Sequence, residues 1–88
     1  MRGIIRSIQF KRDVKLARKR GKDMAKLREL ILLLEEEQPL PPRYKDHPLS
    51  GEWKHHRDSH IEPDWLLLYK VDGNDLNLVR TGTHADLF

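Results

Sequence analysis

The apolar segment WLLLYKV at residues 65–71 is the feature that most constrains how this chain can fold. It is far too short to cross a bilayer, and its density of apolar side chains predicts a central β-strand. An Asp-Gly pair follows at residues 72 and 73 and indicates a hairpin into a second strand over Asp75–Thr81, where apolar and polar residues alternate. We therefore expect an antiparallel sheet at the centre of the fold.

The N-terminal part of the chain has the periodicity of one strand and two helices. Ile4–Phe10 alternates in part and predicts a strand that buries one side. Residues 11–20 (KRDVKLARKR) predict a short amphipathic helix with a strongly basic outer face, which Gly21 ends. Asp23 can cap a second helix. The apolar stripe of this second helix consists of Met24, Leu27, Leu30, Ile31 and Leu34.

The remaining elements complete a simple order of secondary structure. Residues 38–44 (QPLPPRY) contain three prolines and predict an extended connector. Beyond it, Glu52–Arg57 alternates and predicts a further strand. The resulting order predicts a single α+β domain over residues 1–88, with two N-terminal helices packed on one face of a small antiparallel sheet (β-α-α-β-β-β). The other face of the sheet would be open and available to carry the histidines.

Composition limits the classes of protein to which this chain can belong. Its 88 residues provide one modest core, and 38% hydrophobic with 35% charged residues suits a small soluble globule. The absence of cysteine excludes disulfides and thiolate metal sites, and it fits a reducing, cytoplasmic location. The charged N-terminus lacks the long apolar segment of a signal peptide. The longest apolar runs, Leu30–Leu34 and Trp65–Tyr69, are far too short to cross a bilayer, so we expect no membrane as partner.

Charge is unevenly distributed along the chain. Residues 1–34 hold eleven Lys/Arg and three Asp/Glu, a balance of +8, whereas residues 35–88 hold six Lys/Arg and eleven Asp/Glu, a balance of −5. A basic half favours a nucleic-acid backbone or an acidic protein as partner. The alternative is that these lysines and arginines only solvate the helix surfaces.

Groups that can transfer protons are concentrated in one segment. Residues 45–65 (KDHPLSGEWKHHRDSHIEPDW) contain four of the five histidines and both tryptophans, and the fifth histidine follows in RTGTHADLF. Such clustering predicts acid–base chemistry, because histidine can act as acid or base near neutral pH. The candidate residues come from a loop, two strand ends and the C-terminal tail, and they are His47, His60, Asp64, Arg80 and His84.

Cleavage of an RNA phosphodiester by its own 2′-hydroxyl is a reaction that these residue types can catalyse. One group must accept the hydroxyl proton, a second must protonate the leaving 5′-oxygen, and a cation must stabilise the added negative charge on phosphorus. Histidines can serve on either side, Asp64 can act as a base or orient a histidine, and Arg80 can hold the phosphate through two hydrogen bonds. We expect no metal or other cofactor.

Each candidate also has a purely structural interpretation. His47 precedes a proline in a loop and can be an ordinary surface residue. Asp64 can cap a turn, and Arg80 can pair with a carboxylate. Trp53 and Trp65 are more often core residues than platforms for nucleobases.

Metal binding is a separate alternative. His56 and His60 are four residues apart, a spacing that suits a zinc pair on a helix. The surrounding sequence has the pattern of strand and turn, and no cysteine or glutamate motif completes a ligand set. We therefore predict no zinc site of this kind.

Three motifs, in order and at their spacing, give the chain a resemblance to a known family. YKDHPLSGEWKHHRDSHIEPDWLLLYKV followed by RTGTHADLF resembles the YafQ branch of the RelE/ParE superfamily of bacterial toxins, and the N-terminal residues resemble the helical hairpin of that branch. The resemblance implies a RelE-like fold and the toxin of a type II toxin–antitoxin system. It implies a ribosome-dependent endoribonuclease that cleaves mRNA in the A site, with a preference for adenine-rich lysine codons. It also implies a cognate antitoxin, through which alone the toxin would reach operator DNA.

The resemblance also implies roles for individual residues. Four would serve proton transfer or its support: His47 of DHPL, His60 and Asp64 around EPDW, and His84 of RTGTH. Three would bind substrate: Arg80 holds phosphate, Phe88 stacks on or positions a base, and Trp65 belongs to the same site. The division of acid and base roles stays open. We favour Asp64 or His60 on the hydroxyl side and His84 on the leaving-group side.

Two other functions stay open at this point. Members of the ParE side of the superfamily share the fold but are described as acting on DNA gyrase, and a non-enzymatic inhibitor would not need several histidines. A degenerate toxin that serves only as a partner of the antitoxin is a further alternative, although every proposed site position holds a competent residue.

Overall fold

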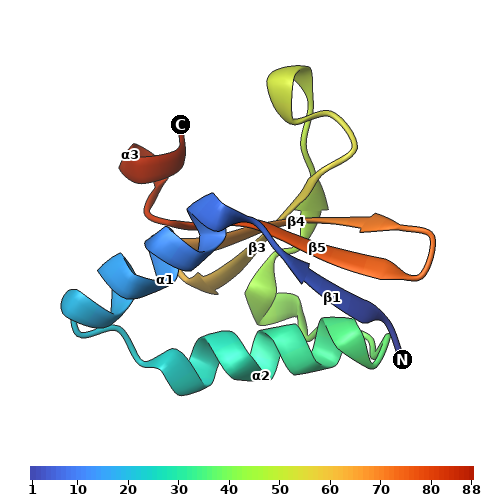
Figure 1. Ribbon diagram of the computed structural model, residues 1–88, viewed down its shortest axis with the longest axis horizontal. Helices are drawn as coiled ribbons and strands as arrows, with labels where there is room; N and C mark the ends of the chain where they lie inside the picture. The colour runs from blue at the N-terminus through green and yellow to red at the C-terminus, as the bar shows by residue number, and fades with distance from the viewer.

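A five-stranded sheet lies at the centre of this computed structural model, which describes residues 1–88 (Figure 1). The elements in chain order are β1 (Gly3–Arg6), α1 (Ile8–Lys19), α2 (Met24–Glu35), the 3₁₀ turn η1 (Pro42–Tyr44), β2 (His47–Pro48), the 3₁₀ turn η2 (Gly51–Trp53), β3 (Arg57–Glu62), β4 (Trp65–Asp72), β5 (Asp75–Gly82) and α3 (His84–Leu87). The strands lie in the order β1-β5-β4-β3-β2, so the WLLLYKV segment is in the middle strand, as predicted.

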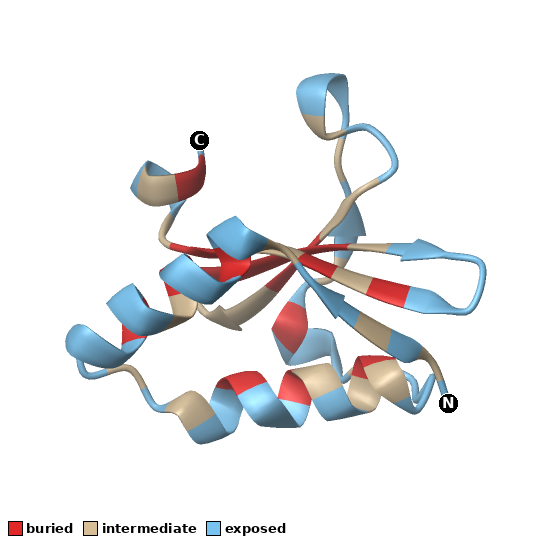
Figure 2. Ribbon diagram, in the orientation of Figure 1, coloured by how far each residue is buried: buried red, intermediate tan, exposed pale blue.

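The core forms because β4 is apolar on both of its faces. Trp65, Leu67 and Tyr69 pack with the inner residues of α1 and α2 in the main cluster of buried side chains. Leu66 and Leu68 point to the other face, where they meet Leu87 of α3. Figure 2 shows the buried positions on the sides of α1 and α2 that face the sheet and along its middle strands. The predicted packing of two helices on one face of the sheet is therefore confirmed.

The sheet is mixed, whereas we predicted an antiparallel one. β3, β4 and β5 pair in antiparallel fashion, but β1 runs parallel to β5. β1 is also shorter than predicted, because Ser7 caps α1 and accepts a hydrogen bond from the Phe10 backbone N–H at 2.9 Å. The helix thus begins at Ile8, and the partial alternation that we assigned to a strand continues into its first turn.

The predicted strand over Glu52–Arg57 is wrong. Residues 51–53 form the turn η2, and His55 has φ 73°, a left-handed conformation that cannot continue a strand. The chain forms instead the short strand β2 at His47–Pro48, which pairs with the start of β3. The connector before it is extended only in part, because η1 occupies residues 42–44.

Other local predictions are confirmed. Gly21 follows α1 with φ 78°, and Asp23 caps α2 by accepting from the Ala25 backbone N–H at 3.0 Å. The Asp72–Asp75 hairpin turns through Gly73, whose φ of 59° favours glycine. None of the helices is long and apolar enough to span a membrane.

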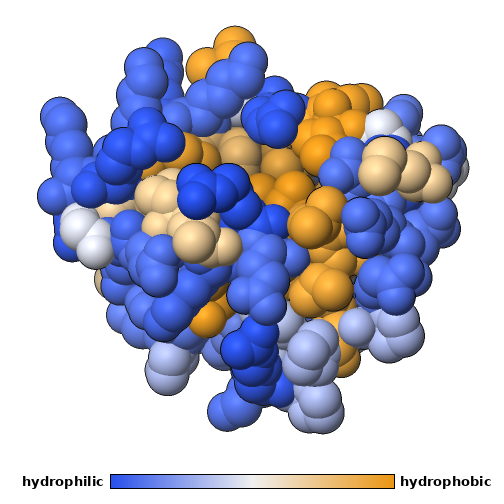
Figure 3. Space-filling model, turned by 90° about the horizontal axis from the view of Figure 1, so that it is seen from below, coloured by the Kyte–Doolittle hydropathy of each residue, from blue (hydrophilic) through white to orange (hydrophobic).

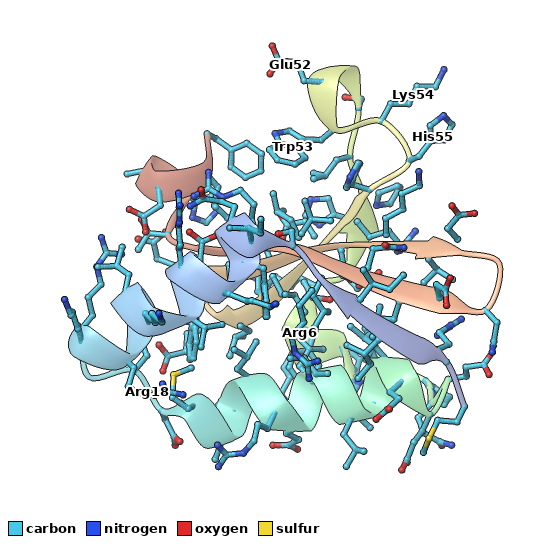
Figure 4. The ribbon with its side chains drawn as sticks, in the orientation of Figure 1. Arg6, Arg18, Glu52, Trp53, Lys54 and His55 are labelled. Carbon is cyan, nitrogen blue, oxygen red and sulfur yellow. The ribbon has the colours of Figure 1, made fainter.

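An apolar groove crosses the surface formed by β1 and α2. Figure 3 shows hydrophobic atoms there, with hydrophilic ones on both sides. The apolar lining comes from Ile4, Ala25, Ile31 and Leu32, and Arg6 and Arg28 are among the charged residues beside it. In Figure 4, Arg6 points from β1 into the space between that strand and α2.

A buried carboxylate joins α1 to β5. Asp13 is 7% exposed and accepts two hydrogen bonds from the Arg80 guanidinium, at 3.0 and 3.1 Å. It also accepts from the Thr81 backbone N–H at 3.2 Å. Removal of this carboxylate would leave a partly buried cation and a buried N–H without partners.

We expect Asp13→Ala to lower the free energy of unfolding by about 3 kcal/mol, because one partner of a buried ion pair is removed. Urea denaturation followed by circular dichroism measures this loss. The control is Arg12→Ala, an exposed neighbour without an ion pair, for which we expect a change within about 0.5 kcal/mol. Equal effects of the two substitutions would show that the buried pair does not stabilise the fold.

Candidate active site

The face of the sheet opposite α1 and α2 carries the acid–base residues. In the β3–β4 register, Asp58 lies opposite Leu68 and His60 lies opposite Leu66. Directly paired residues share a face, so both point to the same side as this pair of leucines, away from the helices. Figure 1 shows that α3 and the loop containing η2 both lie on this side, far from α2.

His47 joins this row of side chains from the neighbouring strand. It pairs directly with Asp58 in the β2–β3 register. Its Nε2 lies 3.7 Å from Asp58 Oδ2, and His60 Nε2 lies 3.8 Å from Asp58 Oδ1. The centroids of the two imidazole rings are 6.1 Å apart. A single carboxylate therefore lies between two of the predicted histidines.

Asp58 is a site residue that the sequence interpretation missed. It is 3% exposed, and its Oδ1 makes no hydrogen bond. Burial raises its pKa, and the positive charge of His60, His47 and His84 opposes that rise. The available signal was the i, i+2 spacing of Asp58 and His60, which places both on one face of a strand.

Asp46 fixes the loop that carries His47. It binds the Arg57 guanidinium at 2.6 Å and the Ser59 hydroxyl at 2.5 Å, and the Tyr69 hydroxyl also donates to it. Burial and this carboxylate together raise the pKa of Tyr69, so the phenol stays protonated as a donor. These bonds connect the DHPL segment to β3 and β4 directly beside the site.

The tautomer of His47 follows from its backbone contact. Its Nδ1 lies 2.8 Å from the Lys45 carbonyl oxygen, which can only accept. Nδ1 therefore carries the hydrogen, and Nε2 is the atom that faces Asp58. The orientation of the ring is set by the backbone of its own loop.

His84 is held by Asp64, as the sequence allowed. Asp64 Oδ1 accepts from the His84 backbone N–H at 2.8 Å and lies 2.6 Å from Nδ1 of the same residue. These two hydrogen bonds, the backbone one first, lower the pKa of Asp64. The carboxylate therefore accepts a hydrogen bond from Nδ1–H, and the Nε2 atom of His84 stays available for other partners. The His84 ring lies 5.7 Å from that of His60.

The short helix α3, which carries His84, is attached to α1. Thr83 and Asp86 form a reciprocal capping box, with Asp86 accepting from the Thr83 backbone N–H at 2.9 Å. Asp86 also binds the Arg20 guanidinium with two hydrogen bonds, at 2.6 and 3.2 Å. The hydrogen bond from Arg20, followed by that from Thr83, holds the pKa of Asp86 far below its usual range.

The three predicted substrate-binding residues have different surroundings. Arg80 is paired with Asp13 through Nε and Nη2, and its Nη1 makes no hydrogen bond within the protein. Trp65 is 1% exposed and donates from its indole to Thr81, so it is a core residue with no free face for a base. Phe88 is 59% exposed and is accessible at the C-terminus.

Trp53 lies beside Phe88, although we expected it in the core. Their ring centroids are 6.4 Å apart in an edge-to-face arrangement, and the His56 ring is 5.4 Å from the indole. Figure 4 shows Trp53 pointing from its loop toward α3, whereas Glu52, Lys54 and His55 point away from it. The pair forms an aromatic rim on the same side of the sheet as the histidines.

The fold and this site define a RelE-like bacterial toxin, a small α+β protein with a cluster of histidines and carboxylates on the open face of its sheet. The family model of the YafQ bacterial toxin of type II toxin–antitoxin systems matches residues 2–88. The chain belongs to this family.

Individual relatives agree with this membership. The mRNA interferase toxin YafQ of Escherichia coli strain K12 is 57% identical over 88 residues, which cover 99% of this chain and 96% of the relative. A crystal structure of the E. coli DinJ-YafQ toxin–antitoxin complex matches with a TM-score of 0.91 at 57% identity, covering 99% of this chain and 97% of that one. A metal-bound toxin from Helicobacter pylori matches with a TM-score of 0.94 at 44% identity, and both chains are fully covered.

The low pKa of Asp86 predicts a pH-dependent contribution to stability. Because its pKa is lower in the folded than in the unfolded chain, the carboxylate stabilises the fold above pH about 4, and this stabilisation is lost as the pH falls. We expect Asp86→Asn to lower the thermal unfolding midpoint at pH 6 and to differ less from the wild type at pH 3. Asp72→Asn, at an exposed carboxylate without an ion pair, is the control. If the difference in unfolding midpoint between Asp86→Asn and the wild type did not change with pH, the low pKa of Asp86 would be contradicted.

Proposed function

We propose that this chain is an endoribonuclease that cleaves mRNA on the ribosome and so inhibits translation. The observation that carries this proposal is the uninterrupted group His47–His60–His84, with ring centroids 6.1 and 5.7 Å apart and a carboxylate beside each end. The relative named mRNA interferase toxin supports the substrate class. A non-enzymatic inhibitor would have no use for three histidines oriented in this way.

The proton transfers divide between His60 and His84, whose rings are neighbours. His60, beside Asp58, accepts the proton of the 2′-hydroxyl while the 2′-oxygen attacks phosphorus. His84 donates a proton from Nε2 to the 5′-oxygen as the P–O5′ bond breaks, and Asp64 stabilises its cationic form through Nδ1. The products are a 2′,3′-cyclic phosphate and a free 5′-hydroxyl. Asp64 is already bound to His84, so we assign the base role to His60.

Two further groups would hold the substrate. The free Nη1 of Arg80 can donate to a phosphate oxygen, while its other edge stays bound to Asp13. The exposed ring of Phe88, supported edge-on by Trp53, can stack on a base. Stacking of this kind tolerates different bases, so codon preference would depend on how the ribosome presents the message.

A row of free cations on α1 supports contact with ribosomal RNA. These side chains are exposed and make no ion pair within the protein, and they are Lys11, Arg12, Lys15, Arg18 and Lys19. Figure 4 shows Arg18 near the C-terminal end of α1, beside the beginning of α2. Unpaired lysines and arginines along one helix suit a phosphate backbone, which releases its counterions on binding.

The partner expected for this toxin is a cognate antitoxin. The E. coli relative has been crystallised as a DinJ-YafQ toxin–antitoxin complex. We propose that this chain binds a protein of the corresponding kind and reaches operator DNA only through it. A toxin that acts on ribosomes and messages would work in the cytoplasm, which is the location that we propose.

Primer extension on a defined mRNA tests the enzyme proposal. We expect the purified protein to cut at adenine-rich, in-frame codons when programmed ribosomes are present, and to leave the naked message almost uncut. Ribosomes are needed because a small open site cannot by itself align the 2′-hydroxyl with the phosphorus. A folded protein that leaves the message intact in both reactions would favour the inhibitor or the degenerate toxin.

In the same assay, His84→Ala should reduce the single-turnover cleavage rate at least about a hundredfold, because a general acid contributes about 10²–10⁴-fold. The matched control is His55→Asn, since His55 is exposed on the η2 loop and asparagine tolerates its positive φ. We expect the control to cut at the wild-type rate and both variants to keep their circular dichroism spectra. Undiminished cleavage by His84→Ala would exclude it as the acid.

Ribosome association should weaken as salt rises, because the cations on α1 would bind phosphates of the ribosomal RNA. The triple variant Lys15→Ala, Arg18→Ala, Lys19→Ala should bind more weakly, and the slope of log K against log salt should fall by about 0.7–0.9 for each phosphate that the variant no longer neutralises. Filter binding to ribosomes across a salt series measures this slope. Lys70→Ala, on β4 outside this surface, is the control. If the triple variant keeps the wild-type slope, α1 does not bind the ribosomal RNA.

A further inference from the structure

We propose that a cleft beside His60, at the edge of β3, binds a phosphate of the mRNA, and that Lys45 supplies the main cation. The phosphate is the one on the 5′ side of the nucleotide whose 2′-hydroxyl attacks. This inference rests on the proposed nuclease function and adds a substrate-binding residue to it. The cleft has a volume of about 360 Å³, and its lining consists of Arg43, Lys45, His60, Ile61, Glu62 and Pro63.

The cleft forms because β2 is shorter than β3. β2 pairs only with Arg57 and Asp58, and His47 lies opposite Asp58. Continuing this antiparallel register by two residues would bring Lys45 opposite His60. Lys45 instead has φ 46° at the end of the η1 turn, and this left-handed conformation prevents the pairing from extending. The edge of β3 at His60 therefore has no strand beside it, and both residues line the cleft.

The backbone of Lys45 is fixed while its side chain is free. Its N–H donates to the Pro42 carbonyl at 3.0 Å, and its carbonyl accepts from His47 Nδ1 at 2.8 Å. A left-handed backbone is strained for a residue with a Cβ, so the turn alone would favour glycine. The lysine side chain at this position is exposed and makes no ion pair within the protein. A strained position that holds an unpaired cation beside a catalytic histidine is typical of a residue that binds substrate.

The carboxylate in the lining does not neutralise this cation. Glu62 accepts hydrogen bonds from Lys22 Nζ at 3.3 Å and from Lys26 Nζ at 3.0 Å. These bonds, that of Lys26 first, lower the pKa of Glu62. The negative charge of Glu62 is thus balanced by two other lysines, and the charge of Lys45 stays available for an anion.

Arg43 is a second cation in the lining, and only part of it is occupied. Its Nη2 donates to Glu29 Oε1 and to the Tyr44 hydroxyl, both at 3.1 Å, whereas Nε and Nη1 make no hydrogen bond within the protein. The side chains of Arg43 and Glu29 are 64% and 58% exposed, so this ion pair is weak and Arg43 can turn to a bound anion. One free and one partly free cation on a polar cleft suit a phosphate.

The proposed division of the proton transfers decides which phosphate reaches the cleft. His60 accepts from the 2′-hydroxyl and His84 serves the leaving 5′-oxygen, so the scissile phosphate lies between these neighbouring rings. The nucleotide that carries the 2′-hydroxyl is then on the side of His60, where the cleft lies. Its 5′ phosphate is the next anion of the chain on that side. Holding this nucleotide at both of its phosphates aligns the 2′-oxygen with the phosphorus that it attacks.

Single-turnover cleavage of a synthetic mRNA on programmed ribosomes tests the role of Lys45. Lys45→Asn removes the charge, and asparagine tolerates the left-handed backbone. We expect the cleavage rate to fall at least about fivefold, because a hydrogen bond to a charged group is lost. Lys45→Arg should keep most of the rate, and Lys70→Asn, on β4 outside the cleft, should cut at the wild-type rate. All three variants should keep their circular dichroism spectra.

A change in the RNA identifies the phosphate that Lys45 binds. The phosphate on the 5′ side of the attacking nucleotide is replaced by an uncharged methylphosphonate, and the nucleotide before it is 2′-deoxy to keep this linkage stable. The reference RNA has the same deoxynucleotide and an ordinary phosphate. The replacement should slow the wild type about fivefold and have almost no further effect on Lys45→Asn, because the two changes remove the same contact. The same replacement at the first phosphate downstream of the scissile one should slow both proteins by the same factor.

The possible outcomes separate this binding site from the nuclease function. Equal slowing of the wild type and Lys45→Asn by the upstream replacement would overturn the site, as would a wild-type rate in Lys45→Asn. In both cases the nuclease function would stand. If the wild type left the reference RNA uncut, the nuclease function itself would be contradicted, and the binding site with it.

Discussion

The pairing of β3 with β4 is the constraint on which the rest of the structure depends. β4 carries apolar side chains on both of its faces. The register in which β3 pairs with it therefore decides which β3 side chains enter the main core and which face outward. With Asp58 opposite Leu68 and His60 opposite Leu66, the acid–base residues lie on the open face. A shift by one residue would place Ser59 there instead and would bury the histidine under the helices.

His47 and His84, two of the three candidate histidines, are oriented by parts of the chain that also stabilise the fold. Asp46 connects the loop of His47 to Arg57, Ser59 and Tyr69. Asp64 binds His84 at both its backbone and its ring. Because these contacts are made within the protein, the imidazoles keep their positions before RNA arrives, and less of the binding energy is needed to align them.

The sequence predicted the elements whose signals are local. The apolar density of WLLLYKV, the stripe of α2, Gly21 and the Asp-Gly turn each depend on residues close together in the chain, and all are confirmed. The strand over Glu52–Arg57 failed because alternation over six residues did not reveal the left-handed backbone at His55. Asp58 was missed for a different reason: its spacing from His60 is a local signal, but its contact with His47 depends on cross-strand pairing.

The surroundings of Arg80 and Trp65 show how far a motif alone can assign a role. Both belong to segments that resemble the family's site, yet Trp65 is buried with its indole bonded to Thr81, and Arg80 is bound to the buried Asp13. The Thr81 hydroxyl accepts a hydrogen bond from the Trp65 indole N–H, and the Thr81 backbone N–H donates to Asp13. These residues therefore form one hydrogen-bond network around the end of β5, the strand that leads into α3. Their contribution to the site is therefore largely to fix where β5 ends, and hence where His84 lies. Arg80 alone adds a free nitrogen that can bind phosphate.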